Sequence, residues 1–151
     1  MRELSPGVFR ATKGDVVGYT SLGVSLDYFK SIVNLQTNFW EILLNKYKAN
    51  SQISWCIALG IHLYDFALSG LLPPSPSVVR DVLKVISNKE NQPVLFHCRH
   101  NRERTGYIAA VYKMKVLGWG FNKAYQDWRD NGCRWVIWRL WRSALIREVL
   151  P

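Results

Sequence analysis

The sequence has few cysteines, few acidic residues and no long apolar runs. Its three cysteines, Cys56, Cys98 and Cys133, are far apart and form no CxxC pair, so their spacing indicates neither a disulfide framework nor a zinc site. Such sparse cysteine usage favours a reducing, cytoplasmic setting. No stretch approaches the roughly 18 consecutive apolar residues of a transmembrane helix, and the first residues lack the apolar core of a signal peptide. These absences predict a soluble chain without stable membrane insertion.

The shortage of acidic residues leaves the chain strongly basic, with 20 Lys and Arg against 11 Asp and Glu and a net charge of +9. A basic surface favours anionic partners, namely phosphorylated small molecules, nucleic acid or an anionic membrane, and charge alone does not choose among them. Hydrophobic residues make up 48% of the 151 residues, which is enough for a core without disulfides or a structural metal. We therefore expect one domain over residues 1–151.

Short β-type runs alternate with helical patterns, which predicts an α/β fold with a central, mostly parallel sheet flanked by helices. The Pro- and Gly-rich segment 65–77 is predicted to be a loop. Strands are expected at 7–11, 32–35, 55–58, 61–63 and 93–97. Helices are expected at 22–30, 39–48, 78–86, 105–117, 121–130 and 134–150.

The last predicted helix combines tryptophans with arginines, and two interpretations of it are open. Trp138, Trp141, Leu145 and Val149 form an apolar stripe of the kind that covers a sheet. The same composition is found in helices that lie on a membrane surface. We favour the core interpretation, because a small domain needs these aromatic side chains inside.

The segment from Val94 to Gly106 runs from a buried strand through a short polar loop into a helix. Backbone N–H groups of such a loop, with the positive end of the helix, form a site for an oxyanion such as phosphate. Cys98 begins the loop, and these dipoles favour its thiolate, which is a nucleophile. Arg104, six residues later, can hold two phosphate oxygens with its planar fork.

These residues resemble the signature of the protein tyrosine and dual-specificity phosphatase superfamily. The signature is His-Cys, five residues, then Arg followed by Ser or Thr, and it is matched by His97, Cys98, Arg104 and Thr105, with Gly106 after them. The resemblance implies a cysteine-dependent phosphatase whose loop lies between a buried strand and a helix N-terminus, and whose intermediate is a phosphocysteine on Cys98. The alternative for Cys98 is a buried, inert thiol, which is how we interpret Cys56 and Cys133.

The resemblance extends to the two opening strands, residues 7–10 and 32–35, which look like those of small atypical dual-specificity phosphatases. One departure is Asn101, which stands where the family usually has Gly. A left-handed backbone would explain that preference, and Asn tolerates this conformation better than most residues. We expect the Thr105 hydroxyl to hydrogen-bond the cysteine sulfur, and His97 to orient the loop without taking part in the chemistry.

A family of this type protonates the leaving oxygen with an aspartate on a mobile loop upstream of the nucleophile. Asp65 follows a predicted strand and opens the long loop, whereas Asp81 lies inside a predicted helix and is the poorer candidate. The alternative for Asp65 is a turn or cap residue. In the expected cycle no metal or other cofactor is needed, because Arg104 and the backbone amides balance the phosphate charge.

The variable loop positions are unusually cationic, which suits a substrate with several phosphates, such as an inositol polyphosphate or a phosphoinositide. The alternative is a phosphotyrosine or mixed phosphoprotein substrate. A protein of a different class is also open, namely a catalytically weak phosphate-binding module whose basic surface docks phospholipid or nucleic acid. Binding alone requires no nucleophile, so the presence of Cys98 counts against this alternative. We therefore expect no nucleic-acid partner. The predicted substrate-contacting residues are Arg99, His100, Asn101, Arg102 and Glu103.

Overall fold

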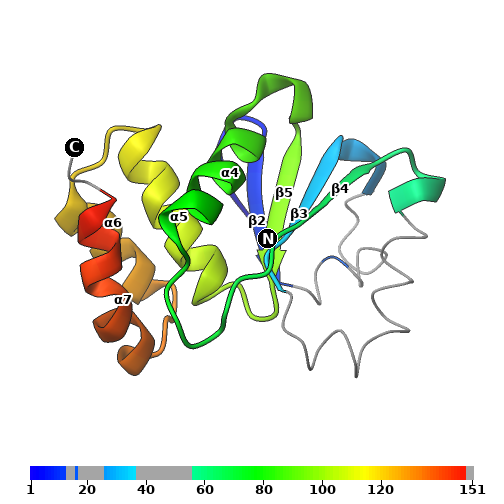
Figure 1. The fold of residues 1–151 in the computed structure, drawn as a ribbon. Coiled ribbons are helices and arrows are strands. Elements are labelled where there is room, and N and C mark those ends of the chain that lie inside the picture. Colours follow the sequence, from blue (N-terminus) through cyan, green and yellow to red (C-terminus); the bar gives the residue numbers. More distant parts are fainter. Residues whose placement is uncertain (13–15, 17–25, 37–55, 149–151) are drawn as a thin grey trace.

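A five-stranded sheet is the centre of the structure, a computed structural model that describes residues 1–12, 16, 26–36 and 56–148. The strand order is β1-β2-β5-β3-β4, and all neighbours are parallel except β1 and β2 (Figure 1). The parallel strands therefore bring their carboxyl ends to one edge of the sheet. The strands are β1 (Arg2–Ser5), β2 (Val8–Thr12), β3 (Ser31–Asn34), β4 (His62–Asp65) and β5 (Val94–Cys98).

Strand β5 is central, and all five of its residues are buried. Its neighbours β2 and β3 pair with it along most of its length, and its side chains reach two cores on opposite faces of the sheet. Phe96 belongs to the larger core and Leu95 to the smaller one. This is why the run Val-Leu-Phe is continuously apolar, as expected for a parallel strand that is covered on both sides.

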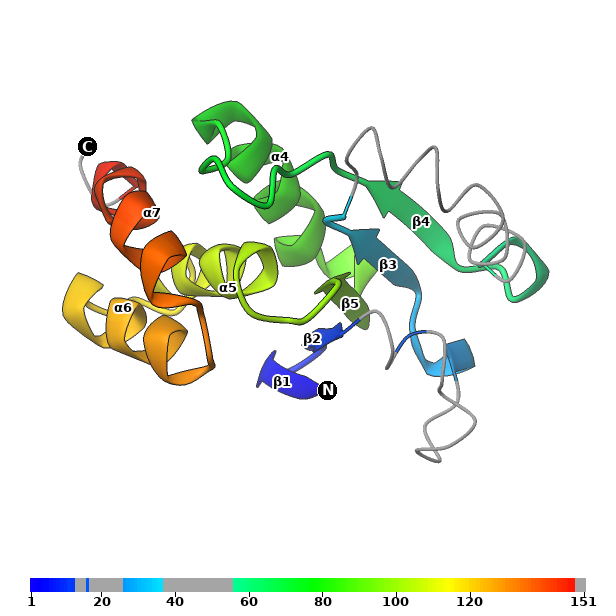
Figure 2. The ribbon, with the colours of Figure 1, turned by 90° about the horizontal axis from the view of Figure 1, so that it is seen from below.

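Four described α-helices cover one face of the sheet. Helices α4 and α5 contact β5, and α6 and α7 lie outside α5, so that α5 is enclosed between the sheet and the outer pair (Figures 1 and 2). This position explains why every residue of α5 from Arg104 to Met114 is buried. The helices are α4 (Pro76–Ser87), α5 (Arg104–Lys115), α6 (Phe121–Asp130) and α7 (Trp135–Arg147), with short 3-10 helices η2 (Leu26–Tyr28) and η3 (Lys89–Asn91).

The α/β class and the mostly parallel sheet are confirmed, and α6 has the predicted bounds. Strand β1 was not predicted, because its polar sequence has no apolar alternation. The expected strand at 55–58 is wrong, since residues 56–58 are helical. Of the helix expected at 22–30, the described part forms only the 3-10 helix Leu26–Tyr28. The helix expected at 39–48 lies outside the described residues.

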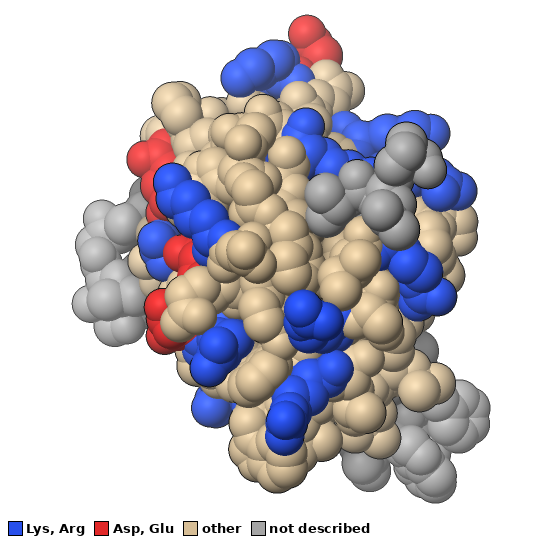
Figure 3. All heavy atoms as spheres, turned by 90° about the vertical axis from the view of Figure 1, so that its left-hand side faces the viewer, with Lys and Arg blue, Asp and Glu red and all other residues tan. Residues whose placement is uncertain are grey.

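Helix α7 packs part of its predicted stripe into the core: Trp141 and Leu145 are fully buried and Trp138 is partly buried, whereas Val149 lies outside the described residues. Its other face exposes Trp135 and Leu140 beside arginines. Figure 3 views the molecule from this side and shows Lys and Arg spread over the face rather than gathered in one patch. None of the described helices is long and apolar enough to cross a membrane.

Candidate active site

Cys98 is the last residue of β5, at the edge where the parallel strands end. Open α/β sheets bind ligands at this edge, beyond the carboxyl ends of the strands. Its side chain is 1% exposed and belongs to the core beneath α5. The chain then turns through residues 99–103 and enters α5, so the thiol lies between a fixed strand and the first turn of a buried helix.

The loop backbone takes a left-handed turn at Asn101, with φ of 55°. This agrees with the conformation expected where the family usually has Gly. Arg10 of β2 binds the residue twice: its Nε donates to Asn101 Oδ1 at 2.7 Å, and its Nη2 donates to the Asn101 carbonyl oxygen. Arg10 is 1% exposed. The loop is therefore fixed from beneath by a buried cation.

Trp128 of α6 holds the next carbonyl of the loop, because its Nε1 donates to Arg102 O at 3.1 Å. The indole is fully buried and passes close to the α5 backbone at Gly106. A Cβ atom at that position would lie 2.3 Å from Trp128 Cδ1. The glycine that follows Thr105 in the signature is thus required here by space, not by an unusual backbone conformation.

Arg104 is buried, and its Nη1 donates to Leu68 O at 3.3 Å. Leu68 lies in the connection from β4 to α4, so the arginine joins the Cys98 loop to the segment that follows Asp65. Thr105 is fully buried, and its Oγ1 makes no hydrogen bond to any described residue, Cys98 included. The predicted bond between this hydroxyl and the sulfur is not present in the structure and stays a prediction.

The cationic residues of the loop are on its outside. Arg99, His100 and Arg102 are all exposed. Glu103 is buried, and its carboxylate accepts from Arg134 Nε at 2.7 Å, which ties the loop to the start of α7. This partner favours an anchoring role for Glu103 rather than the substrate contact that we expected.

Asp65 is exposed at the end of β4, and its Oδ1 accepts from Asn34 Nδ2 at 2.7 Å. The register places Asn34 opposite both Asp65 and His97, so Asp65 is level with the residue before Cys98. Two strand spacings separate β4 from β5, or roughly 10 Å. No other acidic residue lies between β4 and α4.

His97 is fully buried and pairs in the ladder with Ala11 and Asn34. It thus lies on the sheet face opposite to Cys98. The two other thiols are buried elsewhere. Burial raises the pKa of Cys133 to about 12, with Glu103 adding to the effect. Burial, with a smaller contribution from Asp65, also raises the pKa of Cys56. Both thiols therefore stay protonated near neutral pH.

Sequence reasoning missed Arg10 and Trp128 as parts of this site. The available signal for Arg10 was its place in a strand: Val8, Arg10 and Thr12 share one face, and a charged residue there must have a buried partner. For Trp128 no sequence signal distinguishes a core indole from one that binds a loop carbonyl.

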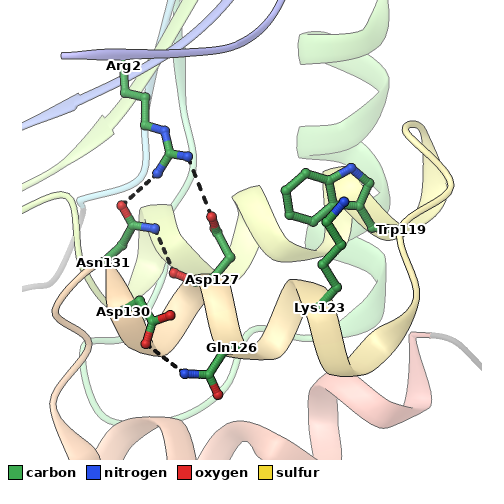
Figure 4. Close-up of a pocket in the computed structure, with 7 residues that line it drawn as sticks. All are labelled: Arg2, Trp119, Lys123, Gln126, Asp127, Asp130 and Asn131. Carbon is green, nitrogen blue, oxygen red and sulfur yellow. Dashed lines mark hydrogen bonds and ion pairs between the residues drawn. The ribbon is translucent and has the colours of Figure 1, made fainter.

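A shallow pocket on α6 is a separate feature, and none of its lining residues is a predicted site residue (Figure 4). Two of its charged residues are paired within the protein, since Asp127 binds both Arg2 at 3.5 Å and the buried Lys113 at 2.5 Å. Arg2 also donates to Asn131 at 2.9 Å. We interpret the cluster as structural, joining β1 to α5 and α6. The lining residues are Arg2, Trp119, Lys123, Gln126, Asp127, Asp130 and Asn131.

Known proteins share both the sequence pattern and the fold described above. The sequence model of the tyrosine phosphatase family matches residues 20–131. This chain belongs to the tyrosine phosphatase family. The matched region includes Asp65, the whole Cys98 loop and α5, and it extends to the end of α6.

Similar family members include the inositol diphosphatase DSP3 of Arabidopsis thaliana, 34% identical over 83 residues. The dual specificity protein phosphatase TpbA of Pseudomonas aeruginosa is 38% identical over 55 residues. These matches cover 52% and 36% of this chain, but only 40% and 25% of the two relatives. The chain therefore matches less than half the length of either relative.

The fold is shared with the core catalytic domain of the PP-IP phosphatase SIW14 from S. cerevisiae, with a TM-score of 0.70 and 18% identity. That comparison covers 99% of this chain and 93% of the other. The structure of P. aeruginosa TpbA gives a TM-score of 0.61 at 21% identity, covering 95% and 80% of the two chains. At these identities the likeness concerns the fold.

Replacing Gly106 by Ala should destabilise the protein and disturb the loop, because the added methyl cannot fit beside Trp128. Overpacking of this kind costs roughly 1–3 kcal/mol, and displacing the indole would break its bond to Arg102 O. Thermal unfolding measures the first effect. Gly70→Ala is the control, since no atom lies within 4 Å of a Cβ at Gly70. A Gly106→Ala chain as stable as Gly70→Ala would mean that Trp128 shifts at no cost.

Proposed function

We propose that this chain is a phosphoric monoester hydrolase that acts through a phosphocysteine intermediate on Cys98. The observation that carries the proposal is the loop after Cys98, whose carbonyls at Asn101 and Arg102 are bound by the buried side chains of Arg10 and Trp128. The C=O and N–H of a planar trans peptide point in opposite directions. The N–H groups of the same two peptides are therefore directed to the opposite side, as in an anion-binding nest.

In the first step, the Cys98 thiolate attacks phosphorus, forming the S–P bond as the P–O bond to the leaving group breaks. Asp65 gives its proton to the leaving oxygen. In the second step a water attacks phosphorus, Asp65 accepts the proton of that water, and the S–P bond breaks to return the thiolate and release inorganic phosphate. Arg104 and the loop amides balance the negative charge that develops on the phosphoryl oxygens.

The acid role of Asp65 requires movement of its side chain, because the carboxylate is bound to Asn34. Segments of this kind close over the substrate in many enzymes. The contact between Arg104 and Leu68 O supports the role, since it links the phosphate-binding arginine to the segment that carries the acid.

Cys98→Ser should abolish turnover and leave the fold intact, because a serine hydroxyl is barely ionised near neutral pH and is not an effective nucleophile here. Steady-state hydrolysis of an aryl phosphate measures this. Cys133→Ser is the matched control, since it changes another buried thiol and should keep the activity. Wild-type turnover by Cys98→Ser would refute the proposal. Phosphate binding without turnover by the wild type would favour the binding-module alternative.

Asp65→Asn should slow the hydrolysis of alkyl phosphates by about 10²–10⁴-fold, the usual contribution of a general acid. The loss should be much smaller for aryl phosphates with good leaving groups, which depart without needing a proton. Values of kcat/KM over a leaving-group series measure the difference. Asp81→Asn is the control, because Asp81 lies on α4 and is largely exposed. An equal loss on all leaving groups would assign Asp65 a structural role.

For the substrate we favour an inositol polyphosphate or a phosphoinositide. Arg99, His100 and Arg102 are exposed in the loop that joins the buried Cys98 to the buried Arg104, so one phosphate can react while others meet these cations. The name of the A. thaliana relative, an inositol diphosphatase, agrees with this choice and suggests including an inositol carrying a diphosphate group among the substrates tested. The name of TpbA supports the second candidate, a phosphoprotein.

Replacing both Arg99 and Arg102 by Gln should raise KM for an inositol polyphosphate far more than for a small aryl phosphate. Exposed charge contacts are each worth only about 1 kcal/mol and weaken with salt. The difference between the two substrates in the rise of KM should therefore shrink as ionic strength increases. The control pair is Arg139→Gln with Arg142→Gln, which removes the same charge from α7. Equal effects of the two double variants, or no hydrolysis of inositol polyphosphates, would favour a phosphoprotein substrate.

A further inference from the structure

Strand β2 lies beside β5 (Figure 1). It carries a buried arginine, Arg10, on the face that Cys98 shares. Arg10 is opposite Phe96 in the ladder, and Thr12 is opposite Cys98. Arg10 is therefore level with the residue two positions before the nucleophile, and it lies beneath the loop. Its guanidinium contacts one loop residue, Asn101, through both the side-chain amide oxygen and the backbone carbonyl oxygen. A single planar fork thus fixes the rotamer and the peptide orientation of Asn101 together.

Placing this cation inside the protein is costly. Desolvation lowers the pKa of Arg10 to about 10, while the negative charges of Asp127 and Cys98 act in the opposite direction. The group is still protonated at neutral pH. Its third nitrogen, Nη1, has no hydrogen-bond partner in the part of the chain that the structure describes. A core position of β2 would be more stable with an apolar residue, so the arginine must be explained by what it holds.

Arg10 holds the conformation of the peptide between Asn101 and Arg102, whose N–H would face the proposed anion site. A left-handed φ is unfavourable for a residue with a Cβ, and Asn101 adopts it while bound to Arg10. The carbonyl that Arg10 binds belongs to the same planar peptide as the N–H of Arg102. Because that carbonyl is held toward β2, the N–H of Arg102 is directed away from β2.

We propose that Arg10 is a positioning residue of the active-site loop, which holds Asn101 in its left-handed conformation and turns the Arg102 N–H toward the bound phosphoryl group. The pair Arg10 and Asn101 does here what a glycine does by its own freedom of backbone conformation. This inference rests on the proposed phosphate site at Cys98, but it does not require that the chain complete a hydrolytic cycle.

The test is the affinity for tungstate, a stable oxyanion, measured by calorimetry on the whole chain. Arg10→Met should weaken tungstate binding by about 10- to 100-fold, the range expected for loss of one hydrogen bond to a charged group, and should lower kcat/KM for an aryl phosphate by a similar factor. Lys113→Met is the matched control, because it removes another buried cation, 3% exposed, whose ion pair is with Asp127 of α6 and not with a loop residue. It should lower the melting temperature yet leave tungstate affinity within about twofold of wild type.

The second part of the test repeats the Arg10→Met substitution in a chain that already carries Asn101→Gly. In that background Arg10→Met should weaken tungstate binding by a smaller factor than in the wild type, because glycine takes a positive φ unaided. Equal factors in both backgrounds would show that Arg10 does not act through Asn101. Wild-type tungstate affinity in Arg10→Met would also overturn the proposal, as would a wild-type chain that binds no tungstate.

Arg10→Lys covers the case in which the Met variant does not fold. Lysine keeps the charge but cannot bridge two oxygens with a planar fork, so its tungstate affinity should also fall by about tenfold or more. Wild-type affinity in Arg10→Lys would show that charge alone suffices and would refute the positioning role. Tungstate binding that depends on Arg10, together with full turnover by Cys98→Ser, would instead refute the phosphocysteine mechanism and leave this inference standing.

Discussion

The planarity of the peptide bond is the constraint on which the rest of the site depends. A loop that directs its amides toward an anion must direct the carbonyls of the same peptides into the protein, where each needs a donor. Here Arg10 supplies a donor for the Asn101 carbonyl, and Trp128 shares the Arg102 carbonyl with the Gly106 N–H of α5. The interior of the protein is therefore polar directly beneath the loop, although the surrounding core is aromatic and aliphatic.

The planarity of the peptide bond also explains why the C-terminal helices α6 and α7 matter for a site that lies outside them. Trp128 is packed against Tyr107 and Trp141, with ring centroids 5.6 Å and 6.2 Å away respectively. Trp141 in turn donates its Nε1 to Leu71 O at 2.8 Å. One aromatic cluster on α5, α6 and α7 thus supports both the Cys98 loop and the segment after Asp65. Helices α6 and α7 therefore support the site, although the match to the family model ends at residue 131, before α7 begins.

The sequence predicted those parts of the structure that depend on local chemistry. The apolar run of β5, the polar loop and the helix at Arg104 are each specified within a few residues, and the left-handed turn at Asn101 follows from the steric preference of a single position. The hydrogen bond from Arg10 could not be predicted in the same way, because 91 residues separate it from Asn101 and only the ladder between β2 and β5 brings them together. The anchoring of Glu103 by Arg134 also depends on the packing of α7.

All three cysteines are buried, so burial does not distinguish the proposed nucleophile Cys98 from the other two thiols. Burial by itself opposes ionisation, and for Cys133 a nearby carboxylate, Glu103, opposes it further. Cys98 differs in what surrounds it: it ends a strand, begins a loop whose carbonyls at Asn101 and Arg102 are bound by buried donors inside the protein, and precedes a helix N-terminus. Fixed dipoles of this kind stabilise an anion without admitting water. A thiol can then be both enclosed and reactive, provided that the backbone around it, and not the solvent, supplies the compensating charge.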